Sequence, residues 1–150
     1  MKVFIVKGSA TMLNELRSML SAIPGVAIVG LAVDESSAIK RINALCPDVV
    51  TLAIRLQSGS GLGVLENIRK HHAGIKVMVL TNCYEKAYVD RCIRLGADYF
   101  FDKFFQYTQF CDALRNLAHL ERIANKPGAL QIPEKLPAAS SSASVAIGNS

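Results

Sequence analysis

The chain has 150 residues and 51% of them are hydrophobic, which is enough for one domain with a substantial core and a short tail. No apolar run approaches the about 20 residues that a membrane-spanning helix needs, and the N-terminus enters a strand pattern without the layout of a signal peptide, so we expect a cytoplasmic protein with no membrane partner. The net charge of +5 is carried by scattered basic residues without an arginine-rich run, so no direct nucleic-acid partner is expected.

Apolar runs alternate with helical periodicity and predict five strand–helix units. In chain order, a strand at 3–6 leads to a helix at 11–22, and a strand at 26–33 leads to a helix that Asp34 caps and Pro47 ends. A strand at 48–53 then leads to a helix that Ser60 caps. A strand at 76–81 leads to a helix at 85–95 that Gly96 closes, and a strand at 98–101 leads to a last helix at 106–124.

The strands are apolar on both faces, which is typical of a parallel sheet covered by helices on each side. We therefore predict an α/β fold, a flavodoxin-like (βα)5 doubly wound parallel sheet with strand order 2-1-3-4-5. In such a sheet the functional crevice lies at the carboxyl ends of strands one and three. Beyond the domain at residues 1–124 the composition turns to proline, alanine and serine, and we expect a flexible low-complexity tail at 125–150.

Six short motifs agree in order and spacing with one known family. They are Phe4-Ile5-Val6 ahead of Ser9, Pro47-Asp48-Val49-Val50, Gly59-Ser60-Gly61-Leu62, Val79-Leu80-Thr81, Leu95-Gly96-Ala97-Asp98-Tyr99 and Phe101-Asp102-Lys103. Together they resemble the CheY-like receiver domains of two-component response regulators, over about residues 1–122.

The resemblance implies a reaction that this chain cannot support with its own residues. In the family, two adjacent acids after the first strand help to hold Mg²⁺, and an aspartate at the end of the third strand takes the phosphoryl group. Lys7 and Gly8 stand at the positions of the acid pair, and Ala53 stands at the phosphoacceptor position. We therefore expect a degenerate receiver, or pseudo-receiver, with no catalytic residue, no metal, no cofactor and no enzymatic activity.

Three residues of switch type are retained. Thr81 and Lys103 stand where the family places the hydroxyl and the lysine that contact the phosphoryl group. Phe100 stands where it places an aromatic that rotates inward. Without a phosphoryl group, nothing shifts the conformational population by that route.

The expected function is phosphorylation-independent protein–protein interaction in signal transduction or transcriptional regulation. The partner would be a kinase, a response regulator or an output protein, or a second copy through helices four and five. Several of the residues expected on this surface are aromatic or arginine, the types enriched at interfaces. The expected residues are Lys86, Tyr88, Asp90, Arg91, Arg94, Tyr99, Phe101, Arg115 and Arg122.

Two alternatives of other classes stay open. In the first, the crevice between Lys7 and Lys103 binds a small anion or metabolite. Against it, Lys103 would pack or would pair with a loop carboxylate, and Lys7 would reach out to solvent. In the second, the chain is a relative of a DNA-binding response regulator that lacks its effector domain.

Overall fold

The computed structural model describes residues 1–82 and 85–124 of the chain. Within them, five strands and five helices alternate as the sequence predicted. Their bounds are β1 (Lys2–Val6), α1 (Ala10–Ser21), β2 (Ala27–Ala32), α2 (Glu35–Leu45), β3 (Val49–Leu52), α3 (Gly61–His71), β4 (Lys76–Thr81), α4 (Lys86–Arg94), β5 (Tyr99–Asp102) and α5 (Tyr107–Ala124). The predicted tail at 125–150 lies outside the described residues. In the described part, no helix has the length and apolar character needed to cross a membrane.

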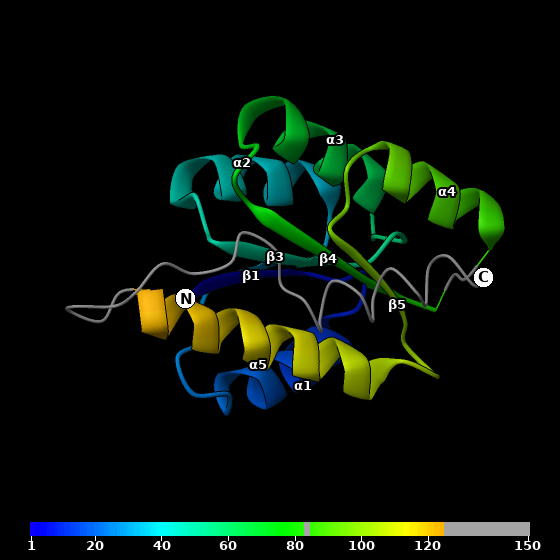
Figure 1. Cartoon of the computed structure of the whole chain (residues 1–150). Helices are drawn as coiled ribbons and strands as arrows, with labels where there is room; N and C mark the ends of the chain where they lie inside the picture. Colours follow the sequence, from blue (N-terminus) through cyan, green and yellow to red (C-terminus); the bar gives the residue numbers. More distant parts are fainter. Residues whose placement is uncertain (83–84, 125–150) are drawn as a thin grey trace.

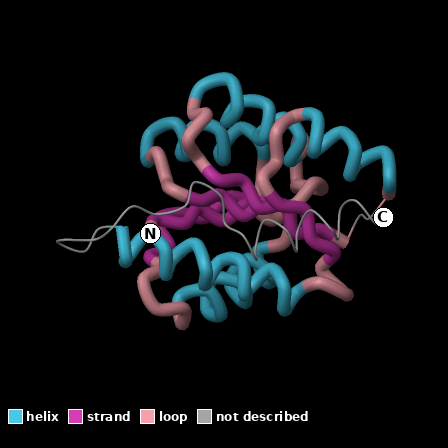
Figure 2. Tube along the Cα trace, viewed as in Figure 1, coloured by secondary structure: helices cyan, strands magenta, loops and turns pink. Residues whose placement is uncertain are grey.

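The strands form one parallel sheet in the order β2-β1-β3-β4-β5, which confirms the predicted flavodoxin-like topology. Figures 1 and 2 show α2, α3 and α4 on one face of the sheet and α1 and α5 on the other. Each face buries its own apolar cluster, with Leu16 and Leu114 in the α1–α5 layer and Ile42 and Ile68 in the opposite layer. Burial on both faces explains why the strands read as continuous apolar runs.

The polar residues predicted to begin and end helices do so. Asp34 Oδ1 accepts a hydrogen bond from the Ser37 amide at 2.8 Å at the start of α2. Ser60 Oγ accepts one from the Leu62 amide at 3.1 Å at the start of α3. Gly96 follows α4 with a φ of 93°, a left-handed conformation that glycine adopts without steric cost. Asp34 and Ser60 mark where two loops at the carboxyl edge of the sheet end, and Gly96 lies at the opposite, amino edge.

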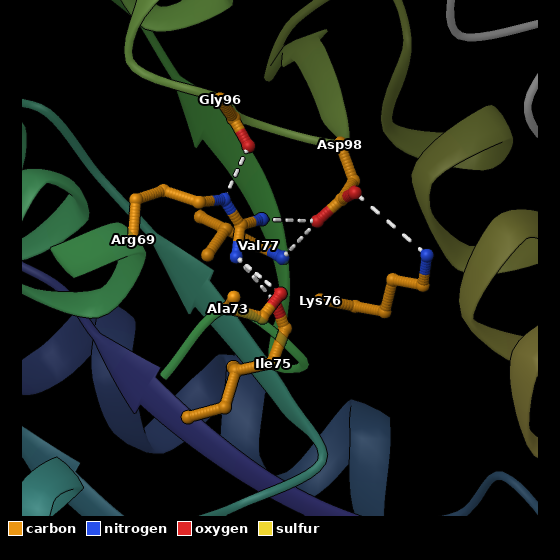
Figure 3. Close-up of polar contacts among 7 residues, drawn as sticks. All are labelled: Arg69, Ala73, Ile75, Lys76, Val77, Gly96 and Asp98. Carbon is orange, nitrogen blue, oxygen red and sulfur yellow. Dashed lines mark hydrogen bonds and ion pairs between the residues drawn. The ribbon is translucent and has the colours of Figure 1, made fainter. Parts of the chain in front are cut away.

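Arg69, in the last turn of α3, joins three segments at the amino ends of β4 and β5 (Figure 3). Its Nε donates to Gly96 O at 2.7 Å, and its Nη1 donates to Ile75 O at 2.7 Å. Its Nη2 donates to Asp98 Oδ2 at 2.6 Å, and the same oxygen accepts the Val77 amide at 2.8 Å. This cluster stabilises the edge of the sheet that lies away from the crevice, and it explains the aspartate of the Gly-Ala-Asp motif.

Candidate functional site

Four chain positions meet at the carboxyl edge of the sheet. Lys7 follows β1, Ala53 follows β3, Thr81 ends β4 and Lys103 follows β5. The parallel register of the four strands brings these positions together. A cavity of about 720 Å³ opens there, with Lys7, Ala53 and Thr81 among the residues that line it. Ligands bind at this place in open α/β sheets, outside the carboxyl ends of the strands where the strand order reverses.

Ala53 is held firmly at the end of β3. Its amide donates to Val6 O at 3.0 Å, and the residue is 7% exposed. Its carbonyl oxygen packs closely against α3, because a Cβ added at Gly61 would lie 2.0 Å from it. The side chain is a methyl group, which has no oxygen to accept a phosphoryl group. The resemblance assigns a nucleophile to this position, and the methyl group of alanine cannot act as one.

Lys7 is buried, at 6% exposed, so the alternative in which it reaches out to solvent is wrong. Its Nζ donates to Leu80 O at 3.3 Å. Burial first, and the positive charge of Lys103 second, together lower the pKa of Lys7 from 10.5 to about 8. The Nζ of Lys103 lies 3.5 Å from the Sδ of Met12 and packs against this methionine instead of a loop carboxylate. Within residues 1–82 and 85–124, neither lysine forms an ion pair.

Gly8 is required by a close approach of two backbone segments. A Cβ added at Gly8 would lie 2.6 Å from Arg55 O and 3.3 Å from Leu56 Cα. A carboxylate at this position would need the segment after β3 to move. The backbone geometry at this position therefore accommodates glycine and would have to change to hold the second acid of the family's pair.

The retained switch-type residues lie inside the protein. Thr81 is 4% exposed at the end of β4, and Phe100 is fully buried in the layer between the sheet and α2, α3 and α4. Lys103 is half-buried directly after β5. Thr81 lines the cavity, Lys103 follows β5 at the same edge of the sheet but is not among the lining residues, and Phe100 packs as a core residue.

The residues at this edge do not fit Mg²⁺. Magnesium is a hard cation that takes carboxylate oxygens, phosphate oxygens and water. The lining holds Lys7 and Arg55, and Glu85 is the acid among the described lining residues. Within the described ranges, no group of three histidine, cysteine, aspartate or glutamate side chains could hold a metal ion.

Most of the surface predicted on helices four and five is accessible. Lys86, Arg91 and Arg94 on α4 are exposed, while Tyr88 and Asp90 are half-buried. Lys86 pairs with Asp90 at 3.3 Å within the helix. On α5, both Arg115 and Arg122 are exposed. The exposed part of the predicted surface is thus rich in arginine.

The prediction that Tyr99 and Phe101 belong to this surface is wrong. They are 2% and 1% exposed, respectively, and pack in the α1–α5 layer. Their rings stack with centroids 5.9 Å apart, and Phe101 meets Phe110 edge to face at 5.8 Å. The physical reason is that β5 is covered by helices on the face to which these side chains point.

The exposed aromatic residues lie a few positions further on, at Phe104 and Phe105, which are 70% and 83% exposed. The loop that carries them is well anchored. Asp102 Oδ1 accepts the Phe104 amide at 2.8 Å and the Phe105 amide at 3.3 Å. Gln106 bonds back to Asp102 twice, by its backbone amide and by its side-chain oxygen, each at 2.8 Å. Sequence reasoning missed this pair because a Phe-Phe dipeptide after a strand looks like core.

The sequence of this chain matches one protein family over most of the described residues. The family model of the response regulator receiver domain matches residues 3–115. The chain belongs to the response regulator receiver family. Among curated relatives, the transcriptional regulatory protein YvfU of Bacillus subtilis (strain 168) is 28% identical over 122 residues, which cover 81% of this chain and 61% of YvfU. The chemotaxis protein CheY of Thermotoga maritima is 27% identical over 117 residues, which cover 78% of this receiver and 97% of CheY.

Solved receiver structures share the fold. The signal receiver domain of the response regulator NarL from Mycobacterium tuberculosis superposes with a TM-score of 0.71 at 25% identity, over 79% of this chain and 95% of that one. The response regulator domain of Thermotoga maritima CheB gives a TM-score of 0.69 at 26% identity, over 80% and 94%. Several relatives are longer proteins: the receiver spans 61% of YvfU and 53% of the response regulator GacA of Pseudomonas syringae pv. syringae (strain B728a).

Proposed function

We propose that this receiver cannot be phosphorylated and acts through protein–protein interaction in signal transduction or transcriptional regulation. The observation that carries the first part is Ala53, fixed at the end of β3 with a methyl side chain. An acyl phosphate forms on a carboxylate, which alanine does not have. The buried ammonium of Lys7 adds positive charge where the reaction would need a divalent cation, which supports the same conclusion.

The proposed protein–protein interaction rests on two phenylalanine side chains, Phe104 and Phe105, that are exposed to water. Phe104 and Phe105 are held outward by a loop whose backbone is tied to Asp102. Two exposed phenylalanine side chains gain free energy when a partner buries them, of about 2 kcal/mol each. Arg91 and Arg94, which are exposed in the last turn of α4, add residues of a type that carries binding energy at many interfaces.

The partner that this surface fits is the acidic and apolar face of another protein. Phe104 and Phe105 supply the apolar contact, and the exposed cations of α4 supply the charge. A kinase, a second response regulator or an output protein could each present such a face. The similarity to YvfU, a transcriptional regulatory protein, favours a pathway that ends in transcription.

The test compares capture of partners from a lysate of the source organism by four forms of the full chain. They are the unmodified protein, Phe104→Ser/Phe105→Ser, Arg91→Glu/Arg94→Glu and the control Lys70→Glu, which changes an exposed residue on α3. We expect one protein to be retained by the unmodified chain and by the control and lost by both double variants. With that protein purified, each double variant should bind at least about tenfold more weakly.

Two outcomes would contradict this proposal. One is a partner that all four forms retain with equal affinity, because function would then lie away from α4 and the Phe104–Phe105 loop. The other is self-association of the purified chain, measured by light scattering and abolished by the same variants. In that case the surface would be a homodimer interface rather than a site for a different protein.

A further inference from the structure

The cavity at the carboxyl edge combines polar groups with room for a ligand. Its volume of about 720 Å³ lies within the range of about 300–1,000 Å³ that is typical of small-molecule sites. Met12, Ala53 and Leu56 give it apolar wall, while Thr81 and Asn82 bring a hydroxyl and an amide. Polar and charged residues, Lys7, Ser9, Arg55 and Glu85 among them, outnumber the apolar ones in the described lining, which suits a charged ligand better than an apolar one.

The ammonium group of Lys7 lies in this cavity without a counter-ion among the described residues. An ammonium carries three N–H donors, and one of them meets Leu80 O at 3.3 Å. No carboxylate within residues 1–82 and 85–124 forms an ion pair with it, although the residue is 6% exposed. A buried cation without a counter-ion is costly, and Lys103 adds a second positive charge nearby. An anion entering the cavity would relieve both costs.

We propose that this cavity binds a phosphate monoester, with the phosphate on the Lys7 ammonium and the organic part against Met12 and Leu56. A dianion matches the two positive charges of Lys7 and Lys103, and its oxygens accept the remaining N–H donors of Lys7. Glu85, the acid among the described lining residues, is exposed, so solvent screens its charge. The site uses residues other than those of α4 and the Phe104–Phe105 loop, so it can exist whether or not a protein partner does.

The experiment titrates the full chain with glycerol 3-phosphate and follows binding by calorimetry and by amide NMR shifts. We expect saturable binding of one equivalent, with shifts at residues 7–9, 53–56 and 81–82. Glycerol, which has the organic part without the charge, should not bind. The variant Lys7→Met keeps the length of the side chain and removes the charge, and it should weaken binding at least about tenfold. Lys103→Met should weaken it less.

The control Lys40→Met removes an exposed lysine of α2 outside this cavity and should bind like the unmodified chain.

A second readout separates a role in binding from a role in folding. The charged groups around Lys7 are Lys103, Arg55 and Glu85. At about pH 8 a phosphate monoester is already a dianion, so the proton that binding takes up goes to the protein. Calorimetry in two buffers of different ionisation enthalpy should detect this uptake in the unmodified chain and not in Lys7→Met.

Two results would overturn the inference. One is the absence of saturation by glycerol 3-phosphate with the unmodified chain, given an NMR spectrum that shows it folded. The other is saturable binding whose affinity stays the same in the double variant Lys7→Met/Lys103→Met, because the phosphate would then sit elsewhere on this basic protein.

Discussion

Lys7 places an ammonium group inside the protein, where burial and Lys103 lower its pKa from 10.5 to about 8. The unfolded chain therefore binds this proton more tightly than the folded chain does. Between about pH 8 and pH 10.5 the free energy of unfolding should rise with pH, because the cost of the buried charge disappears as Lys7 loses its proton. Below about pH 8 the full cost, of about 3 kcal/mol, is present.

The variant Lys7→Met tests this account of the charge. At neutral pH it should raise the free energy of unfolding by up to about 3 kcal/mol. The advantage over the unmodified chain should shrink as the pH rises from 8 to 10.5. Urea unfolding of both proteins across this range measures the difference between their free energies of unfolding. Tyrosine and cysteine also ionise at high pH, but they do so in both proteins, so their effect cancels in this difference. A variant less stable than the unmodified chain at every pH would contradict a buried, unpaired charge.

Thr51 in β3 carries a second uncompensated polar group. It is 1% exposed, and its Oγ1 has no hydrogen-bond partner among the described residues. Valine has the same shape without the hydroxyl, so Thr51→Val should raise the free energy of unfolding by about 1 kcal/mol. Thr108→Val, at an exposed position on α5, is the matched control and should change it by less than about 0.5 kcal/mol. Destabilisation by Thr51→Val would mean that the hydroxyl does bond within the fold.

Single residues were the hardest to predict from sequence. The place of Ala53 could be predicted, because the apolar run at 49–53 marks a strand that ends there. Its lack of a phosphoryl acceptor follows from the methyl side chain. The burial of Lys7 does not, because a lysine after a strand usually extends its charge into solvent. Tyr99 and Phe101 could have been placed correctly, because the same argument that predicted strands covered on both faces puts them inside.

At the scale of elements, Arg69 connects the end of α3 to the starts of β4 and β5 through Asp98, with both side chains less than a third exposed. Arg69→Met should lower the free energy of unfolding by about 2 kcal/mol, since it leaves the Asp98 carboxylate without its guanidinium and the carbonyls of Ile75 and Gly96 without that donor. Urea unfolding measures the loss. The neighbouring exposed Lys70→Met should change stability by less than about 0.5 kcal/mol.

A double-mutant cycle decides whether the Arg69 effect comes from the pair. If it does, Asp98→Asn and Arg69→Met together should cost clearly less than the sum of the two single changes. Additive costs would contradict the shared cluster of Figure 3.

The caps at Asp34, Ser60 and Gly96 could be predicted because they are local. The Arg69 cluster could not, since it joins segments that the sequence keeps far apart.

At the scale of the whole molecule, the order of elements was sufficient to predict the sheet and the place of its crevice. Alternating strands and helices form a parallel sheet, and the carboxyl ends of β1 and β3 then meet where the strand order reverses. The surface of the molecule could not be predicted to the same degree. Phe104 and Phe105 are apolar like the core, and nothing in their spacing shows that a loop tied to Asp102 turns them outward.

Whether this receiver takes a phosphoryl group can be measured from the mass of the intact protein. The full chain is incubated with acetyl phosphate and Mg²⁺ beside Thermotoga maritima CheY as the comparison protein. We expect no phosphoryl adduct on this chain under conditions in which the comparison protein becomes phosphorylated. A stoichiometric adduct that hydroxylamine removes would show an acyl phosphate on another carboxylate, and the receiver would then be open to phosphorylation after all.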